Sequence, residues 1–303
     1  MPPAVAVVGS LNLDMVVDVA RLPGRGETVV GRNFQSSPGG KGANQAAAAA
    51  ALSSGIAMAG RVGDDTAGAA LVADLRTRGV DTSGVLSTPG VPTGAATVAV
   101  EPGGENLIIV APGANAAVTP QDVAIAAVRS AQVVLLQLEI PLAAVAATVA
   151  VATGTIVLNP APATELPADL LAGVDVLVPN EWELAALAGV RPATYSPQEL
   201  ATLARKVTAG PVVVTMGARG ALVVGSASDD PMMATPPAVA PVDTTGAGDC
   251  FCGALCVSLA SGARLADAAR YAVAAAALST TGAGARGALP DDAAVRTLLE
   301  SSS

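Results

Sequence analysis

The sequence predicts an α/β protein: a three-layer α/β/α core with a mainly parallel sheet, plus a small antiparallel β lid. Three observations lead to this fold class. Short β-branched runs alternate with alanine-rich helical stretches, which is the pattern of a parallel sheet covered by helices. Half of the 303 residues (51%) are apolar, so the chain can bury a large core. Two regions break the alternation, with strands joined by Gly and Pro turns and few helix signals.

The elements of the core follow in chain order from the hydrophobic pattern. Buried strands are expected at residues 4–8, 133–138, 155–158, 174–178 and 212–215. Helices are expected at residues 44–52, 68–78, 119–130, 142–153, 181–187, 197–209, 248–261 and 265–280.

Four further strands make up the expected lid. They are predicted at residues 15–19, 28–34, 93–100 and 106–110, and the segment EPGGE at 101–105 is expected to form the hairpin turn between the last two. We expect this small sheet to be inserted into the core at about residues 12–37 and 92–111. The whole chain, 1–303, is then a single α/β domain.

Composition and charge exclude several classes of function. Sixteen Lys and Arg against 25 Asp and Glu give a net charge of −9, which provides no basic surface for nucleic acid or anionic lipid. The absence of histidine excludes Ser-His-Asp and Cys-His catalysis and His-ligated zinc, so a general base must be Asp, Glu, Lys or Cys.

Nothing in the sequence is typical of membrane insertion. The uncharged stretch between Glu139 and Glu165 is interrupted by Pro141, Gly154 and Pro160, and the N-terminus lacks the basic region of a signal peptide. We therefore expect a cytoplasmic protein. The three cysteines, Cys250, Cys252 and Cys256, have the spacing of neither a CxxC redox pair nor a zinc site, so buried thiols are expected.

The clearest local motif is DTTGAGD at residues 243–249, followed by an apolar helical run. A Gly-Ala-Gly turn at the start of a helix presents backbone N–H groups at the positive end of the helix dipole, which suits a phosphate. Asp249 falls in the first turn, beside anything bound there. The same residues would also suit an ordinary loop with an acidic residue near a helix N-terminus, so this motif alone leaves both interpretations open.

The second motif is GGKGAN at residues 39–44, again ahead of a helix. It is not a Walker loop, because Lys41 is followed by Gly42 instead of Ser or Thr. The first strand has one glycine where a dinucleotide fingerprint needs three. The glycines allow close backbone approach to a small polar ligand, to which Lys41 and Asn44 could form directional hydrogen bonds.

Polar residues also follow the predicted strands. Asn12 and Asp14 come after the first strand, Glu139 ends another, and Asn180 and Glu183 follow a third. Ligands of open parallel sheets bind beyond the carboxyl ends of the strands, so these side chains would converge on one edge. Asn180 is equally suited to be an N-cap, with Glu183 completing a capping box.

In combination, these motifs resemble the ribokinase-like carbohydrate kinase family. The family's two signature patterns match residues 39–63, which include GGKGANQA, and residues 243–254. Between them the family's other segments occur in the expected order: DLRTRGVD, PTGAATVAV, ENLIIVAPGAN, QLE, PNEWE and TMGARG. The ordered set extends nearly from end to end of the chain.

The resemblance implies an ATP-dependent kinase that transfers the γ-phosphoryl group to the 5-hydroxyl of D-ribose. By similarity, Asp249 is the catalytic base, and Gly246, Ala247 and Gly248 form the anion hole through their backbone N–H groups. The implied sugar-binding residues are Asn12, Asp14, Gly40, Lys41, Asn44, Glu139 and Asp249. Those implied for ATP and its Mg²⁺ are Asn180, Glu183, Thr215, Gly217 and Gly220. Those implied for a monovalent cation, K⁺, are Asp243, Thr245, Ser279, Gly282 and Gly284.

The family's lid closes over the sugar and pairs with a second subunit, which implies a homodimer.

Several alternatives stay open. A nucleoside kinase of the same family would need aromatic side chains to stack a base, and the chain has only Phe34, Trp182, Tyr195, Phe251 and Tyr271. A fructokinase would differ by a few lid residues. A non-catalytic sugar-binding regulator is disfavoured by Asp249 and the intact glycine turn. An oxidoreductase lacks the glycine fingerprint.

Overall fold

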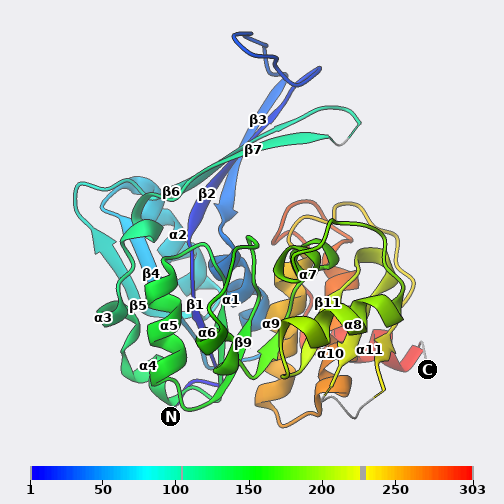
Figure 1. Cartoon of the computed structure of the whole chain (residues 1–303). Helices are drawn as coiled ribbons and strands as arrows, with labels where there is room; N and C mark the ends of the chain where they lie inside the picture. The colour runs from blue at the N-terminus through cyan, green and yellow to red at the C-terminus, as the bar shows by residue number, and fades with distance from the viewer. Residues whose placement is uncertain (1, 104, 226–229, 302–303) are drawn as a thin grey trace.

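The computed structural model describes residues 2–103, 105–225 and 230–301 and shows an α/β body from which a smaller sheet projects (Figure 1). Within the described residues the body has a nine-stranded sheet in the order β13-β12-β11-β10-β9-β8-β1-β4-β5. Its neighbours pair in parallel from β5 to β11, and β12 and β13 add antiparallel pairs at the other edge. The strands are β1 (Val5–Val8), β4 (Ile56–Gly63), β5 (Asp81–Thr88), β8 (Val133–Leu136), β9 (Thr155–Leu158), β10 (Val176–Leu177), β11 (Val212–Thr215), β12 (Ala221–Val224) and β13 (Met232–Ala234).

Helices cover both faces of this sheet, as the predicted three-layer core requires. Successive side chains of β1 point to opposite faces: Val5 and Val7 join one hydrophobic cluster, and Ala6 and Val8 join the other. The first cluster packs under α1 (Lys41–Leu52), α2 (Thr66–Thr77), α9 (Ala247–Ala260), α10 (Leu265–Ser279) and α11 (Asp292–Ser301). The second packs under α3 (Pro120–Val123), α4 (Ala126–Ser130), α5 (Leu142–Val151), α6 (Ala168–Ala172), α7 (Glu181–Leu187) and α8 (Pro197–Val207).

Most expected helices and core strands are present with small shifts at their ends, and some elements were not predicted. The helix expected at 119–130 is two short helices, α3 and α4, because Ala124 and Ile125 between them leave the helical conformation. The unpredicted elements are β4, β5, β12, β13, α6, α11 and two short 3₁₀ helices, Gly113–Ala117 and Gly217–Arg219. Strand β4 is rich in Ala and Gly, and β5 consists mostly of Asp, Ser, Thr and Gly, so neither has the apolar β-branched run by which the other core strands were predicted.

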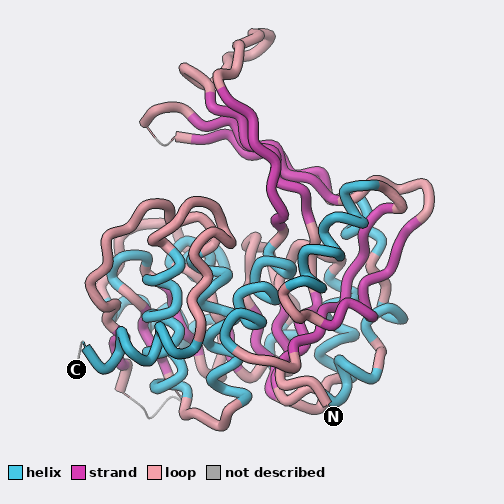
Figure 2. The backbone as a smooth tube through the Cα atoms, turned by 180° about the vertical axis from the view of Figure 1, so that it is seen from behind, coloured by secondary structure: helices cyan, strands magenta, loops and turns pink. Residues whose placement is uncertain are grey.

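The projecting sheet contains β2 (Asn12–Asp18), β3 (Asn33–Gly39), β6 (Gly94–Val100) and β7 (Asn106–Ala111), in the order β3-β2-β6-β7. Two antiparallel pairs, β2 with β3 and β6 with β7, are joined by a parallel pair between β2 and β6. Figure 2 shows these strands from behind, standing away from the body. The turn expected at 101–105 includes residue 104, which lies outside the described residues.

The prediction of a strand at 28–34 was wrong, because the strand lies at Asn33–Gly39. The run Glu27-Thr-Val-Val has the higher β propensity, but pairing with β2 decides the position: Asp18 pairs with Asn33 and Asn12 with Gly39. The corrected strand therefore ends immediately before Gly40, where α1 begins.

A membrane span is not found: no helix in the described part of the chain has the length and hydropathy to cross a bilayer. The uncharged stretch after Glu139 contains α5 and then β9, as expected. The three cysteines are buried free thiols on α9, which confirms that prediction.

The contact between α1 and α9 positions the pocket described below. Helix α1 consists largely of alanine and is buried from Gly42 to Ala49, so it approaches α9 closely. The two backbones are close at Gly253: a Cβ atom there would lie 2.7 Å from the carbonyl oxygen of Gln45 and 2.9 Å from the nitrogen of Ala49. Only glycine fits between these backbones.

Replacing Gly253 by alanine should therefore push α1 and α9 apart. We expect a loss of about 1–3 kcal/mol in the free energy of unfolding, the usual effect of overpacking a core, measured by urea denaturation. Gly210→Ala is a matched control, because its new Cβ would meet nothing closer than 3.6 Å. Equal stability of the two variants would contradict the close packing.

Candidate active site

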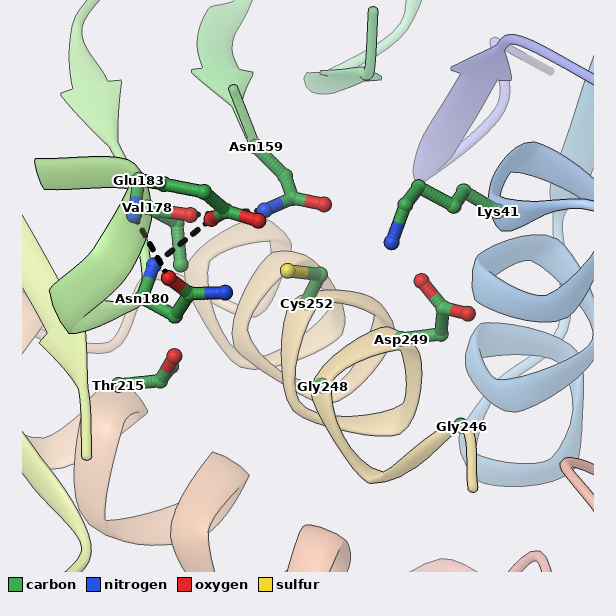
Figure 3. Close-up of a pocket in the computed structure, with 10 residues that line it drawn as sticks. All are labelled: Lys41, Asn159, Val178, Asn180, Glu183, Thr215, Gly246, Gly248, Asp249 and Cys252. Atoms are coloured by element: carbon green, nitrogen blue, oxygen red, sulfur yellow. Dashed lines mark hydrogen bonds between the residues drawn. The ribbon is translucent and has the colours of Figure 1, made fainter. Parts of the chain in front are cut away.

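The candidate site is a cavity of about 140 Å³ at the carboxyl ends of the central strands (Figure 3). Asn159 follows β9, Val178 follows β10 and Thr215 ends β11, while the N-terminal ends of α1, α7 and α9 supply the remaining wall. The lining residues are Lys41, Asn159, Val178, Asn180, Glu183, Thr215, Gly246, Gly248, Asp249 and Cys252. Of the strand-end residues expected to converge, Asn180 and Glu183 line this cavity, whereas Asn12, Asp14 and Glu139 are not among its lining residues.

Helix α9 begins at the glycine turn. Gly246 is the N-cap residue with φ 76°, and a Cβ there would lie 2.6 Å from the Cβ of Ala285, so the turn requires glycine on two counts. The N–H of Cys250 donates to the Gly246 carbonyl at 2.8 Å, and the N–H of Ala247 donates to Thr244 at 3.2 Å. The turn places the positive end of the helix dipole at the cavity.

Asp249 is buried at this helix start and is held by two side chains of α1. The Asn44 Nδ2 donates to one carboxylate oxygen at 3.2 Å, and the Gln45 Nε2 donates to the other at 3.0 Å. Burial raises the pKa of Asp249, while Lys41 and the two amide donors oppose the shift. A raised pKa makes the carboxylate a stronger proton acceptor.

Lys41 extends from the start of α1 toward Asp249 (Figure 3). Burial alone would lower its pKa, but the carboxylates of Asp249, Glu139 and Glu183 outweigh burial and raise it. The ammonium group therefore stays charged inside the cavity, beside the helix start.

A chain of buried amides supports Asp249, and the sequence patterns did not reveal it. Gln45 Nε2 also donates to the Asn159 Oδ1 at 3.2 Å, and Gln45 Oε1 accepts from Gln137. The Asn159 Nδ2 donates to the Val178 carbonyl at 2.9 Å, which fixes its orientation. Gln45 belongs to the GGKGANQA segment and Asn159 directly follows a buried strand. These two sequence features could have identified both residues as candidates for the site.

The residues implied for sugar binding lie where the projecting sheet meets the body. Asn12 is buried, and its Oδ1 accepts from the Asn115 Nδ2 at 2.7 Å. Glu139 accepts from the Ser10 hydroxyl and from the Lys41 N–H, the latter at 3.1 Å. Gly40 is the N-cap of α1 with φ 84°.

Asp14 lies on β2 and packs against Gly39 of β3. A Cβ at Gly39 would lie 2.0 Å from a carboxylate oxygen of Asp14, so the glycine makes room for this side chain. Burial and then Glu139 raise the pKa of Asp14 to about 6; Arg286 opposes the shift and Asp249 adds to it. The pKa of Asp14 thus depends on charged groups from three segments far apart in sequence.

The residues implied for the nucleotide divide into two groups. Asn180 and Glu183 line the cavity and form the expected capping box of α7, with both reciprocal hydrogen bonds at 2.8 Å. Thr215 also lines it. Gly217 (φ 55°) and Gly220 (φ 90°) flank a short turn after β11 and are not among its lining residues.

The candidate cation ligands lie on two adjoining loops. The Asp243 carboxylate accepts from the N–H groups of Thr245 and Gly284, each at 2.8 Å, which joins the loop before α9 to the loop after α10. Ser279, at the end of α10, donates its hydroxyl to Ala276. In the described residues no group of three or more His, Cys, Asp or Glu side chains could hold a metal. One carboxylate with carbonyl and hydroxyl oxygens fits a hard monovalent cation in its donor chemistry.

A glycine turn at a helix start, at the carboxyl edge of a parallel sheet, is a position at which α/β proteins commonly bind phosphate-containing ligands, and here a buried carboxylate lies beside it. The model of the pfkB family of carbohydrate kinases matches residues 3–292. The chain belongs to this family and is a carbohydrate kinase.

Relatives of known name cover nearly the whole chain. A ribokinase of Bacillus subtilis is 37% identical, with 97% of this chain and 99% of the relative covered. The structure of an Arabidopsis thaliana ribokinase complexed with ribose and ATP has a TM-score of 0.89 at 35% identity and 99% coverage of both chains. A Thermotoga maritima ribokinase structure has a TM-score of 0.88 at 31% identity, covering 98% of this chain and 99% of the other. The α/β core and small sheet therefore match ribokinase structures.

The raised pKa of Asp14 has a measurable effect on stability. The folded state holds a proton on Asp14 up to about pH 6, whereas the unfolded chain loses it near 3.8, so this group's contribution to stability falls as the pH rises between those values. Asp14→Asn should raise the free energy of unfolding at pH 7 by about 1–3 kcal/mol and change it little below pH 4.

Urea denaturation at both pH values measures this difference. The carboxyl titration itself can be followed by ¹³C NMR, with Asp14→Asn identifying the signal. A variant that is less stable than the wild type at pH 7, or a titration near pH 4, would contradict the assignment.

Proposed function

We propose that this kinase transfers the γ-phosphoryl group of ATP to the 5-hydroxyl of D-ribose and so forms ribose 5-phosphate. The observation that supports this most is Asp249, held on both carboxylate oxygens at the start of α9, beside Lys41 and the glycine turn. Curated relatives named ribokinase cover the chain nearly from end to end, and one solved relative contains ribose and ATP.

Asp249 acts as the general base in this proposal. Its carboxylate accepts the proton of the sugar hydroxyl as the oxygen attacks the γ-phosphorus, while the bond from that phosphorus to the bridging oxygen breaks and ADP leaves. Asn44 and Gln45 keep the carboxylate oriented. The helix start of Gly246, Ala247 and Gly248 stabilises the charge that develops on the transferring group. Ala247 must then exchange its N–H bond to Thr244 for one to the phosphoryl oxygen.

The polar side chains at the base of the lid hold the sugar. Carboxylates accept hydrogen bonds from hydroxyl groups, and amide groups both donate and accept them, so this mixture suits a polyhydroxylated ligand. The proposed set comprises the backbone of Gly40 and the side chains of Asn12, Asp14, Lys41, Asn44, Glu139 and Asp249.

Glu183 and Asn180 line the cavity, and in this proposal they lie on the side that holds the nucleotide. Burial raises the pKa of Glu183, an effect that a nearby cation would counteract, so the carboxylate suits a position close to a hydrated Mg²⁺. Mg²⁺ would neutralise charge on the phosphates. Thr215, Gly217 and Gly220 are assigned to the ATP side, and Asp243, Thr245, Ser279, Gly282 and Gly284 to K⁺.

The projecting sheet is proposed to act as a lid and a dimer contact within a single-domain, cytoplasmic enzyme. Its edge strand β7 exposes four consecutive apolar side chains, from Leu107 to Val110, and Phe34 on β3 is 61% exposed. An exposed apolar sheet of this kind is typical of a protein interface. Analytical ultracentrifugation should therefore show a dimer at micromolar concentration, and a monomer there would contradict this contact.

A coupled ADP-release assay against a panel of acceptors tests the substrate. D-ribose should give the highest kcat/KM among ribose, 2-deoxyribose, fructose, adenosine and pseudouridine, with and without K⁺. The panel includes 2-deoxyribose because a Salmonella typhi deoxyribokinase is 34% identical over 94% of this chain. Nucleosides are disfavoured because Phe251 and Tyr271 are buried in the core, leaving few aromatic groups for stacking. A higher value for any other acceptor would overturn the substrate assignment.

Asp249→Asn is the matched variant for this assay, because the amide keeps the shape and removes the base. It should bind ribose nearly as well as the wild type while kcat falls by about 10²–10⁴-fold. Ribose affinity is measured by calorimetry without ATP. A variant that retains most of its kcat would show that the base lies elsewhere, and a wild type that binds sugar without turnover would favour the non-catalytic alternative.

A further inference from the structure

A buried arginine that has no role in the proposal above contacts Asn44, one of the residues assigned to the sugar. Arg286 lies in the loop between α10 and α11, and its side chain is only 6% exposed. Its Nε donates to the Asn44 Oδ1 at 2.9 Å, and its guanidinium nitrogens donate to the Asp74 carboxylate at 2.5 Å and to the Gly39 carbonyl at 3.5 Å. One side chain thus connects α1, α2 and the end of β3.

The contact with Asn44 determines which way the amide of Asn44 faces. A guanidinium group has only donors, so the Asn44 oxygen must face Arg286 and the Asn44 nitrogen must face away. The nitrogen then donates to Asp249 at 3.2 Å. The opposite orientation would place an N–H₂ group against the guanidinium and an oxygen against the Asp249 carboxylate, which is unfavourable at both ends.

Asp74 holds Arg286 in place and supplies its counter-charge. This carboxylate on α2 also accepts from the Nε of Arg78 at 3.1 Å, but Arg78 is one-third exposed and no hydrogen bond links it to Asn44. A buried guanidinium without its carboxylate would be strongly unfavourable, so Arg286 needs Asp74 in order to stay buried at this position. Arg78 provides a natural comparison, since it binds the same partner.

We propose that Arg286, anchored by Asp74, is a positioning residue that fixes the Asn44 amide toward Asp249 and holds the sugar side of the pocket in its binding geometry. This inference rests on the proposed function, because Asn44 and Asp249 are assigned to the sugar. Arg286 itself acts through Asn44 and Gly39.

The positive charge of Arg286 also acts on the pKa of Asp14, and this effect can be tested separately from the hydrogen bond to Asn44. Gly39, whose carbonyl faces the guanidinium, packs directly against the Asp14 carboxylate. The charged groups that act on Asp14 are Glu139 after β8, Asp249 on α9 and Arg286; the two carboxylates favour its protonated form and Arg286 favours its ionised form. Arg286 therefore helps to keep a sugar-binding carboxylate ionised at neutral pH.

Three variants separate the hydrogen bonds from the charge. Arg286→Met removes both, Arg286→Lys keeps the charge without the planar donor set, and Arg78→Met is the control on the same carboxylate. Loss of a hydrogen bond from a charged group should raise the KM for ribose by about 10–100-fold in Arg286→Met, with a smaller effect on kcat. Arg78→Met should change KM by less than about threefold.

The pH profile of kcat/KM distinguishes positioning from a purely structural role. Its acid limb should move to higher pH in Arg286→Met and stay in place in Arg286→Lys, whose KM should still rise. If Arg286→Met matches Arg78→Met in KM and in the acid limb, the proposal is overturned. Should Arg286→Met fail to fold, Arg286→Lys decides: an unchanged KM in that variant overturns the proposal too.

A readout without turnover separates this inference from the proposed function. The side-chain N–H₂ signals of Asn44, assigned in ¹⁵N NMR spectra with Asn44→Asp, should shift in Arg286→Met and Arg286→Lys and stay unchanged in Arg78→Met. If the wild type phosphorylates a different sugar, the kinetic arms use that sugar. If it phosphorylates none, the proposed function fails, and unshifted Asn44 signals would overturn the positioning role independently.

Discussion

The close contact of α1 with α9 is the constraint on which the rest of the site depends. Gly253 and the alanines of α1 bring two backbones together where no larger side chain would fit. One turn before Gly253, Asp249 consequently meets Asn44 and Gln45, which follow Lys41 on α1. Tight packing of small residues thus converts two separate glycine motifs into one cavity.

Around this contact, Asp249 and the two amides that hold it are each bound by further polar groups. Arg286 and Asp74 orient Asn44, while Gln137 and Asn159 orient Gln45. Buried amides and charges are costly unless they are paired, so these hydrogen bonds favour one arrangement, although the Oε1 of Gln137 is buried without a partner. The Asp249 carboxylate is therefore held before any ligand binds, which is the preorganisation that phosphoryl transfer needs.

The sequence allowed the fold class and most helices to be predicted, because these depend on local periodicity. It did not indicate β4 and β5, whose small and polar residues become strands only by pairing with neighbours. The position of β3 was also decided by pairing: Thr28 to Val30 have the propensity, yet Asn33 to Gly39 match β2 in register.

The local sequence by itself determined the glycine turn, the capping box at Asn180 and the presence of Asp249 in a first helical turn. These features involve neighbours within a few residues, so their geometry follows from backbone rules. Only the tertiary structure decided that Arg286 lies behind Asn44, 242 positions away in sequence, and that Asp14 is buried enough for its pKa to reach about 6. Burial and charge pairing between distant segments depend on how the chain packs. A local sequence pattern contains no information about which distant segments come into contact.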